Sequence, residues 1–511
     1  MDYDHHRVVV RGQGLSFPEL VAVARQGAEV VLAPEVREIV TNSRRAVEKM
    51  IEENRVVYGV TTGFGKFSEI SISPEEAASL QTNLLVSHAC GVGDPLPEDV
   101  VRGMLLLRVN SLIQGFSGIR LQTIEALIAM LNLRIHPIVP EKGSLGSSGD
   151  LCPLSHLMLP LLGLGEAIYQ GERMTGAEAL HRAGLQPIEL AAKEGLALNN
   201  GTQCMTAVGA LAVADALELL ELAELSASMS LEALNGLIAA FDERIHILRG
   251  QKGQVISAKR IRTLTEGSTY LSQPPHARVQ DAYALRCTAQ VHGASRDAIE
   301  YVAQVVEREM NAVTDNPLIF ADTDEAISGG NFHGEPIALA MDFLAIALSE
   351  LANISERRLE RMVNPALSNG LPPFLTTQSG LHSGFMIVQY SAAALVSENK
   401  VLAHPASVDS IPSSANQEDH VSMGTIAARK ARSILENVRQ VLAMEMLTAA
   451  LALDLRGKAK MGVATQQAYL RIRKDVTPML HDRVISPDIA AVAKMTQDGS
   501  LYAIVKSCIE L

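Results

Sequence analysis

The stretch TQCMTAVGALAVADALELLELAELSASMSLEALN, residues 202–235, decides the fold. Its apolar residues recur at three- and four-residue spacing, it holds one glycine and no proline, and it is too long for one strand. Leu, Ala and Met, which supply most of its apolar mass, are strong helix formers. The stretch therefore predicts one long helix.

Three further segments have the same character. Residues 425–456 lack both proline and glycine, residues 337–362 form a third candidate helix, and residues 294–311 form a shorter one. Parts are apolar nearly all round, as in LTAALALDL at 447–455, so these helices are expected to be central in a bundle or covered by other subunits. The predicted fold is all-α with a long central helical bundle, in an oligomer. A large monomer with one central helix is the alternative.

Shorter helical runs are predicted over residues 15–133, separated by turns that contain glycine and proline. We therefore expect a smaller, mainly helical N-terminal region over residues 1–200, and a long-helix bundle with the C-terminal region over residues 201–511. No linker able to separate independent domains is visible, so the two regions are expected to form one integrated unit.

Composition excludes several classes of protein. Of 511 residues, 47% are hydrophobic, which excludes a disordered chain. The net charge of −13 makes nucleic acid and anionic membranes poor partners. Five scattered cysteines without a CxxC pair predict reduced thiols in a cytoplasmic protein. The start MDYDHHRVVV has no following apolar segment, so no signal peptide is expected.

Common catalytic motifs are missing from the chain. It has no complete phosphate-binding or dinucleotide-binding glycine motif, no HExxH and no GxSxG. Its His, Asp and Glu residues do not follow metal-ligand spacing, so no metal is expected. An enzyme with this sequence needs a less usual electrophile or nucleophile.

The loop GSLGSSGDLCPLSH, residues 143–156, is the strongest candidate for such chemistry. Glycine lacks a Cβ, so the amide nitrogen of Gly149 can approach and attack the carbonyl of Ser147, closing a five-membered ring. Loss of the Ser148 hydroxyl as water then leaves an electrophilic alkene. Two plainer interpretations stay open: a helix start capped by Asp150 or Ser148, and a nest of backbone amides that binds an anion.

The loop resembles the prosthetic-loop motif of the aromatic amino acid ammonia-lyases, in which Ala-Ser-Gly cyclises to 4-methylideneimidazol-5-one (MIO). Ser147 stands where alanine is usual, but its side chain is not consumed in the ring. The resemblance implies MIO formed from Ser147-Ser148-Gly149, with no metal or external cofactor. Seven further blocks resemble the family and follow its order: YGVTTGFG (58–65), LVSHACGVG (85–93), LALNNGTQ (196–203), VQDAYALRC (279–287), NAVTDNPL (311–318), GGNFHGEP (329–336) and SANQEDHVSMG (414–424).

Two of these blocks resemble the histidine-specific members of the family. Ser87-His88 stands where phenylalanine- and tyrosine-specific relatives have His-Leu or Phe-Leu, and Glu418 stands where those relatives usually lack an acid. Imidazole carries both a donor and an acceptor, which His88 and Glu418 can pair. A phenyl ring would leave them unpaired at about 1–3 kcal/mol each. A buried structural histidine and a helix-dipole acid are the plainer alternatives.

The reaction implied by the resemblance is elimination of ammonia from L-histidine to give trans-urocanate, a step of histidine degradation. Tyr58 is expected to remove the β-proton, for which its pKa, ordinarily near 10, must be lowered. Arg286 is expected to bind the substrate carboxylate. Glu418 is expected to bind the imidazole and to assist deprotonation, and Asp150 is expected to shape the loop.

Further residues are expected to line the pocket and polarise the ring. Gln280, Tyr283 and Arg286 are spaced by three and would share one face of a helix. The whole set implied by the resemblance also includes Asn200, Asn316 and, packed near the ring, Phe332. Loop packing, a surface ion pair, a polar helix face and ordinary core burial are the alternatives for single members.

The family assembles as a homotetramer with sites shared between subunits, and the same is expected here, with L-histidine as the small-molecule partner. Two rival functions stay open. One is the same fold acting on phenylalanine or tyrosine, either as an ammonia-lyase or as an aminomutase. The other is a non-catalytic helical scaffold.

Overall fold

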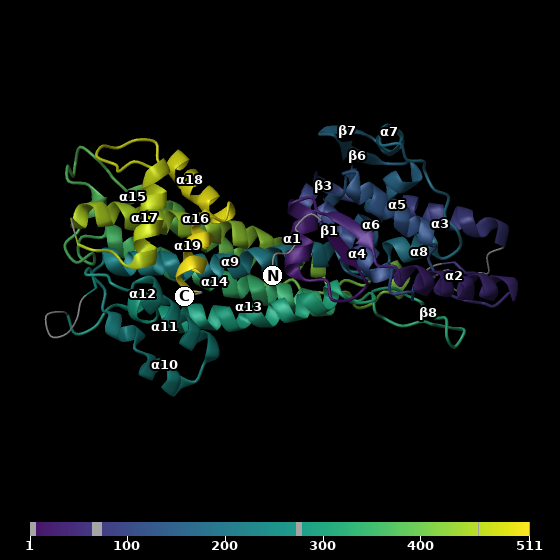
Figure 1. The fold of residues 1–511 in the computed structure, drawn as a ribbon, viewed down its shortest axis with the longest axis horizontal. Coiled ribbons are helices and arrows are strands. Elements are labelled where there is room, and N and C mark those ends of the chain that lie inside the picture. The colour runs from purple at the N-terminus through teal and green to yellow at the C-terminus, as the bar shows by residue number, and fades with distance from the viewer. Residues whose placement is uncertain (1–6, 64–73, 272–277, 458, 510–511) are drawn as a thin grey trace. The chain divides into compact units, whose positions relative to one another are not determined.

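The computed structural model describes residues 7–63, 74–271, 278–457 and 459–509, and its elements are drawn in Figure 1. The predicted helical fold is confirmed. Contacts along the chain define two compact units: unit 1, residues 1–214, 303–342 and 405–429, and unit 2, residues 215–302, 343–404 and 430–511. The domain boundary expected after residue 200 stays a prediction, and the compact units are interleaved along the sequence.

Four long helices each contribute residues to both units. They match the four segments predicted from the sequence: α9 (Gln203–Ala233), α13 (Thr288–Met310), α14 (Glu335–Val363) and α16 (Gly424–Arg456). Only α13 begins well before its predicted start. Because α9 and the run 441–453 of α16 are apolar nearly all round, they are buried along almost their whole length.

A buried charge cluster joins α9, α14 and α16 within unit 2. The Glu445 carboxylate accepts hydrogen bonds from Ser230 at 2.6 Å and from Ser355 at 2.6 Å. Arg358 donates to the same carboxylate from Nε at 2.5 Å and from Nη2 at 3.0 Å. Both charged side chains are fully buried, so each depends on the other to remain ionised.

The remaining helices of unit 2 are shorter. They are α10 (Glu243–Arg249), α11 (Lys252–Leu264), α12 (Tyr283–Arg286), α15 (Met386–Leu402), α17 (Val463–Asp475), α18 (Ser486–Gln497) and α19 (Ser500–Ile509), with 3₁₀ turns at Ile238–Phe241 and Pro373–Leu375. Within the described ranges, only α14 is long and apolar enough to cross a membrane, and 67% of its most apolar window is buried in the protein, as in the core helix of a soluble protein.

Unit 1 combines helices with short strand pairs that the sequence did not predict. Its helices are α1 (Phe17–Arg25), α2 (Val36–Glu52), α3 (Pro74–His88), α4 (Glu98–Leu112), α5 (Leu121–Asn132), α6 (Leu151–Met158), α7 (Gly176–Arg182) and α8 (Glu194–Asn199), with 3₁₀ turns at Leu159–Leu162 and Ser414–Asn416. The strands are β1 (Arg7–Val10), β2 (Glu29–Leu32), β3 (Val92–Pro95), β4 (His136–Pro137), β5 (Pro140–Lys142), β6 (Glu166–Tyr169), β7 (Glu172–Thr175), β8 (Leu318–Phe320) and β9 (Glu325–Ile327).

The strands form small two- and three-stranded sheets. β1 pairs with β2 in parallel, and the β3–β5, β4–β6–β7 and β8–β9 pairs are antiparallel. The β3–β5 pair matters most for function, because β5 leads directly into the glycine-serine loop and β3 follows α3, which carries His88.

A buried arginine holds the segments around the loop in unit 1. Arg108 of α4 donates to the carbonyl of Ala197 at 2.9 Å, to Gln203 Oε1 at 2.8 Å and to the carbonyl of Thr314 at 3.2 Å. Burial lowers the pKa of this guanidinium to about 10, so it stays charged at neutral pH. It therefore fixes the end of α8, the start of α9 and the segment before Asn316 to one another.

Candidate active site

Close backbone packing fixes the conformation of the glycine-serine loop between β5 and α6. Gly149 has a φ of +69°, and the amide of Asp150 donates to the carbonyl of Gly201 at 2.7 Å. A Cβ added to Gly149 would lie 2.2 Å from that carbonyl oxygen. Only glycine fits here, both because φ is positive and because the two backbones touch.

The other end of the loop is held by the segment before α16. The amide of Met423 donates to the carbonyl of Leu145 at 2.9 Å, and the buried hydroxyl of Ser422 donates to the carbonyl of Gly146 at 3.1 Å. A Cβ on Gly146, whose φ is +70°, would come within 2.2 Å of Ser422 Oγ. Ser147 and Ser148 are therefore held between two anchored glycines.

Asp150 is fully buried and connects three elements. One carboxylate oxygen accepts from Thr425 Oγ1 and from Ser144 Oγ at 2.9 Å, and the other accepts from the amide of Met205 at 2.9 Å. Burial raises the pKa of this carboxyl, and the hydrogen bonds from Thr425, Met205 and Ser144 oppose that rise. Its carboxylate makes no cap hydrogen bond to α6, so the interpretation of Asp150 as a side-chain cap is wrong.

A pocket of about 250 Å³ opens beside the loop. It brings together predicted residues from three distant parts of unit 1, and it adds serines and cysteines that the prediction missed. The lining residues are Ser87, His88, Cys90, Gly143, Ser144, Leu145, Ser147, Gly149, Leu151, Cys152, Ser413, Ser414 and Glu418.

His88 ends α3 and faces this pocket with one ring nitrogen already paired. Ser87 Oγ donates to the carbonyl of Leu84 at 3.2 Å and lies 3.0 Å from His88 Nδ1. Nδ1 is therefore already paired, and Nε2 is the ring nitrogen left for a substrate group. Burial lowers the pKa of His88, while its hydrogen bond to Leu84 and the charge of Glu418 oppose the shift, so the ring is neutral at neutral pH.

Glu418 reaches the pocket from a strained turn. It exchanges backbone hydrogen bonds with Ser413, at 2.9 and 3.3 Å, and its carboxylate accepts from Ser413 Oγ at 3.2 Å. Between them, Ser414, Ala415 and Asn416 all have φ between +52° and +64°. For Ser414 and Ala415 this conformation costs about 1–2 kcal/mol each, a cost typical of residues placed for function.

Asn200 and Asn316 are buried beside these segments. Asn200 precedes Gly201, and its Oδ1 has no hydrogen-bond partner among the described residues. Asn316 Oδ1 accepts from Ser328 Oγ at 3.1 Å and from the amide of Gly329 at 2.7 Å. Those two bonds orient the amide so that its Nδ2 hydrogens are presented for another acceptor.

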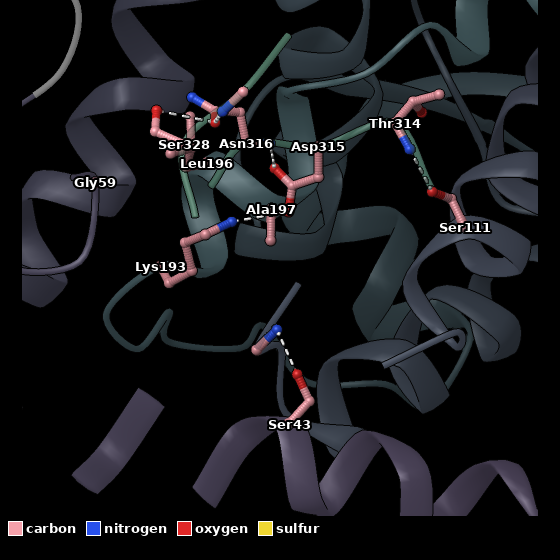
Figure 2. A network of polar contacts seen from close by, with 12 residues as sticks. Ser43, Gly59, Ser111, Lys193, Leu196, Ala197, Thr314, Asp315, Asn316 and Ser328 are labelled. Carbon is pink, nitrogen blue, oxygen red and sulfur yellow. Dashed lines mark hydrogen bonds and ion pairs between the residues drawn. The ribbon is translucent and has the colours of Figure 1, made fainter. Parts of the chain in front are cut away.

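A buried ion pair supports Asn316. Figure 2 shows Lys193, Asp315 and Asn316 meeting within unit 1. Lys193 Nζ lies 2.8 Å from Asp315 Oδ2, and both side chains are fully buried, while Asp315 Oδ1 accepts from the amide of Asn316 at 2.7 Å. Burial lowers the pKa of Lys193, and the carboxylate of Asp315 opposes that shift. The pair therefore positions the backbone that carries Asn316.

Tyr58 and Phe332 are in unit 1 but do not line the pocket. Tyr58 is half-buried in the turn after α2, and the last two residues of its sequence block, 64–65, lie outside the described residues. Phe332 is half-buried between β9 and α14. Its role near the ring stays a prediction, with core burial as the alternative.

Gln280, Tyr283 and Arg286 belong to unit 2. The expectation that all three share a helix face is wrong, because α12 begins only at Tyr283. Asp281 holds the preceding segment off the helix by accepting from the amide of Leu237 at 2.6 Å. Tyr283 is 69% exposed, its ring lies 4.4 Å from the Arg286 guanidinium carbon, and it lines a separate pocket of about 530 Å³.

Comparison with known proteins identifies the family. The family model described as aromatic amino acid lyase matches residues 15–474. The chain belongs to this family. Its similarity extends over full lengths: it is 60% identical to a histidine ammonia-lyase of Symbiobacterium thermophilum, covering 97% of this chain and 98% of the relative. Members of this family depend on MIO.

Solved structures of family members share the fold. The histidine ammonia-lyase of Trypanosoma cruzi superposes with a TM-score of 0.92 at 43% identity, covering 98% of this chain and 95% of that one. The tyrosine aminomutase of Streptomyces globisporus superposes with a TM-score of 0.94 at 38% identity, covering 98% of both chains. Family members with this fold therefore carry out different reactions, and the pocket residues must decide between them.

Proposed function

We propose that this family member eliminates ammonia from L-histidine to give trans-urocanate, as a carbon–nitrogen lyase. The observation that carries the proposal is the pocket that places His88 and Glu418 beside Ser147 and Gly149. The histidine ammonia-lyase relative at 60% identity supports the same substrate. In the reaction the bond from the α-carbon to nitrogen breaks, a β-proton leaves, and a conjugated double bond forms.

Two polar groups favour imidazole over a phenyl or phenol ring. The Glu418 carboxylate accepts from the N–H of the substrate ring, and His88 pairs with the other ring nitrogen. A phenyl ring would leave both desolvated without a partner, at about 1–3 kcal/mol each. The two residues together therefore favour histidine over phenylalanine by a factor of about 30 or more.

The residues around the loop fit a self-made MIO group from Ser147-Ser148-Gly149. Gly149 is pressed onto Gly201 with no room for a Cβ, and Asn316, whose Oδ1 is already paired, presents its buried Nδ2 hydrogens to an acceptor of the ring. When formed, that ring supplies an electrophilic carbon for the substrate amine. Asp150 holds its carboxyl between Thr425, Ser144 and Met205, and so keeps the loop in its compact conformation.

Other residues complete the proposed site by binding and by proton transfer. Tyr58 removes the β-proton, and Arg286 binds the substrate carboxylate in two-pronged contact. Gln280 and Tyr283 line the substrate pocket, and Phe332 packs near the ring. Because Tyr283 is 69% exposed and the trio belongs to unit 2, we propose that another subunit of a homotetramer supplies Gln280, Tyr283 and Arg286. The enzyme is proposed to act in the cytoplasm.

The test supplies L-histidine, L-phenylalanine and L-tyrosine separately and follows the ultraviolet absorbance of the conjugated acrylate, with ammonia release in parallel. Histidine turnover well above that of the other two is expected. Turnover of phenylalanine or tyrosine alone would contradict the substrate assignment, and a β-amino acid product would indicate an aminomutase.

Intact mass provides an independent measurement of the prosthetic group. Ring formation removes two waters from the chain, so the folded protein is expected to be lighter than its sequence by that amount. An unmodified, inactive protein would support the scaffold alternative. The matched control is the variant Ser148→Ala, which has no hydroxyl to lose. Its mass is expected to show the loss of at most one water.

A further inference from the structure

Two cysteines lie in the wall of the pocket and have no place in the proposed elimination. Cys90 is in the turn between α3 and β3, and Cys152 is the second residue of α6. Both line the pocket together with His88 and Ser147. Cys90 is exposed to solvent, whereas Cys152 is 7% exposed.

The two thiols are neighbours. The Cys152 sulfur packs against the backbone beside Cys90, since a Cβ on Gly91 would lie 3.3 Å from Cys152 Sγ and a Cβ on Gly143 would lie 2.8 Å from it. Both cysteines line the same pocket, and Cys90 is close enough to influence the pKa of the Cys152 thiol. Two glycines, at positions 91 and 143, thus leave the space that the sulfur occupies.

The environments of the two thiols give them different roles. Because Cys90 is exposed, its sulfur can attack a small disulfide dissolved in water. Burial raises the pKa of Cys152 to about 11, so this thiol reacts slowly with external reagents. It reacts well only with a sulfur held next to it, as the Cys90 sulfur is.

We propose that Cys90 and Cys152 form a dithiol modification site, which small disulfides oxidise to an intramolecular disulfide, and that this bond slows turnover in the adjacent pocket. The first part rests on the geometry of the two thiols alone. The second part rests on the proposed histidine elimination.

The oxidation balances in two exchange steps. Cys90 attacks a disulfide RSSR, giving Cys90–S–SR and one RSH. Cys152 then attacks the Cys90 sulfur, giving the Cys90–Cys152 bond and a second RSH. The two thiol protons end on the two RSH molecules, and RSSR is reduced while the protein dithiol is oxidised.

The new bond acts on the substrate pocket through the turn that carries His88. The amide of Cys90 donates to the carbonyl of His88 at 3.0 Å, and Cys152 follows Asp150 by two residues. Oxidation therefore ties the His88 turn to the start of α6. A displacement of about 1 Å in a substrate-positioning group costs up to about 100-fold in rate, so we expect a loss of about tenfold or more.

The first experiment maps the bond. Fully reduced protein is incubated with oxidised glutathione, free thiols are alkylated, and peptides are analysed by mass spectrometry. A peptide pair linked through Cys90 and Cys152 is expected, with Cys204, which is 1% exposed, recovered as a free thiol. Glutathione left on Cys90 with Cys152 alkylated as a free thiol would overturn the proposal.

The second experiment uses variants, each compared with its own reduced form. Wild type and the control Cys508→Ser are expected to lose activity with oxidised glutathione and to regain it with dithiothreitol. Cys90→Ser is expected to show no loss, and Cys152→Ser is expected to retain glutathione on Cys90. If the Cys90–Cys152 bond is mapped but the activity is unchanged, the proposal that this bond slows turnover is wrong. Reduced wild type without activity on histidine would contradict the proposed function, and the peptide map would then decide the dithiol site by itself.

Discussion

Thr425 shows how much one hydroxyl contributes at the residue scale. It comes from the start of α16, yet it donates to Asp150, which lies 275 positions earlier in the chain. It also contacts Ser144 Oγ at 3.2 Å. The loop itself was predictable through its resemblance to a family motif, because its glycines and serines alone also fit a plain capped loop. Its clamp was not, because no local pattern connects residues this far apart.

Replacing Thr425 by valine is expected to slow ring formation. The isosteric side chain removes a hydrogen bond to the buried Asp150 carboxyl, at a cost of about 1–3 kcal/mol, and it loosens the loop in which Gly149 must approach Ser147. The measurement is a time course of intact mass after refolding.

The matched control is Thr448→Val on the same helix. Thr448 is also buried, but its hydroxyl donates to the carbonyl of Met444 one turn earlier at 2.6 Å. The Thr448→Val variant is expected to form the ring at the wild-type rate. Equal rates for Thr425→Val and Thr448→Val would contradict the role of Thr425.

His136 is expected to make stability depend on pH. Burial lowers its pKa to about 4, against the opposing charge of Glu98. The unfolded chain takes up this proton near pH 6.5 and the folded chain does not, so stability falls as the pH falls from about 6.5 to about 4. The loss is about 1.4 kcal/mol per pH unit, and about 3 kcal/mol in all.

Thermal unfolding at about pH 7 and about pH 5, at one protein concentration, checks this expectation. His136→Gln is expected to reduce the difference in midpoint between the two pH values. His181→Gln, on the exposed surface of α7, is the matched control. An unchanged difference in His136→Gln would exclude His136 as the source.

At the scale of elements, the long helices were predictable because proline is absent and apolar residues cover nearly every side. The short strands were not, since strands such as β3 and β4 have only a few residues and pair with partners that lie far along the chain. The prediction that Gln280 lies on a helix was based only on its three-residue spacing from Tyr283 and Arg286. Instead, the hydrogen bond from the Leu237 amide to Asp281 fixes the segment before Tyr283, and α12 begins only at Tyr283.

Glu445 is expected to hold α9, α14 and α16 in register. Glu445→Gln removes the partner charge of the fully buried Arg358 and is expected to lower the free energy of unfolding by about 3–5 kcal/mol. The double variant Arg358→Met/Glu445→Leu removes both charges and is expected to lose less than the single variant. Urea unfolding of the two proteins measures the difference, and a larger loss in the double variant would contradict this account.

At the scale of the whole molecule, the sequence located the chemistry only through its resemblance to a family. The segments 85–90, 143–152 and 413–418 meet in one pocket of unit 1, and no spacing rule brings them together. The sequence did not predict three pocket residues, Cys90, Cys152 and Ser413. Isolated cysteines and serines match no motif, and only the fold shows that they meet. Gln280, Tyr283 and Arg286 belong to unit 2, and their part in the site stays a prediction.

Mixing two inactive variants tests whether subunits share sites. Tyr58→Phe and Tyr283→Phe are each expected to be nearly inactive. If each site takes Tyr58 from one subunit and Tyr283 from another, co-expression leaves on the order of a quarter of the sites with both tyrosines in a randomly mixed symmetric oligomer. Activity measured on histidine is then expected to return to that fraction of wild type. No recovery would place both tyrosines on one chain.

The contact between Asp150 and Thr425 has a consequence for synthesis on the ribosome. The segment that would condense leaves the exit tunnel long before the hydroxyl that clamps it, because 275 positions separate the two. At about 5–20 residues per second the delay is roughly 15–55 s. If the segment condenses as proposed, ring closure on the nascent chain is therefore expected to be slow, and to reach its full rate once the segment that carries Thr425 has emerged.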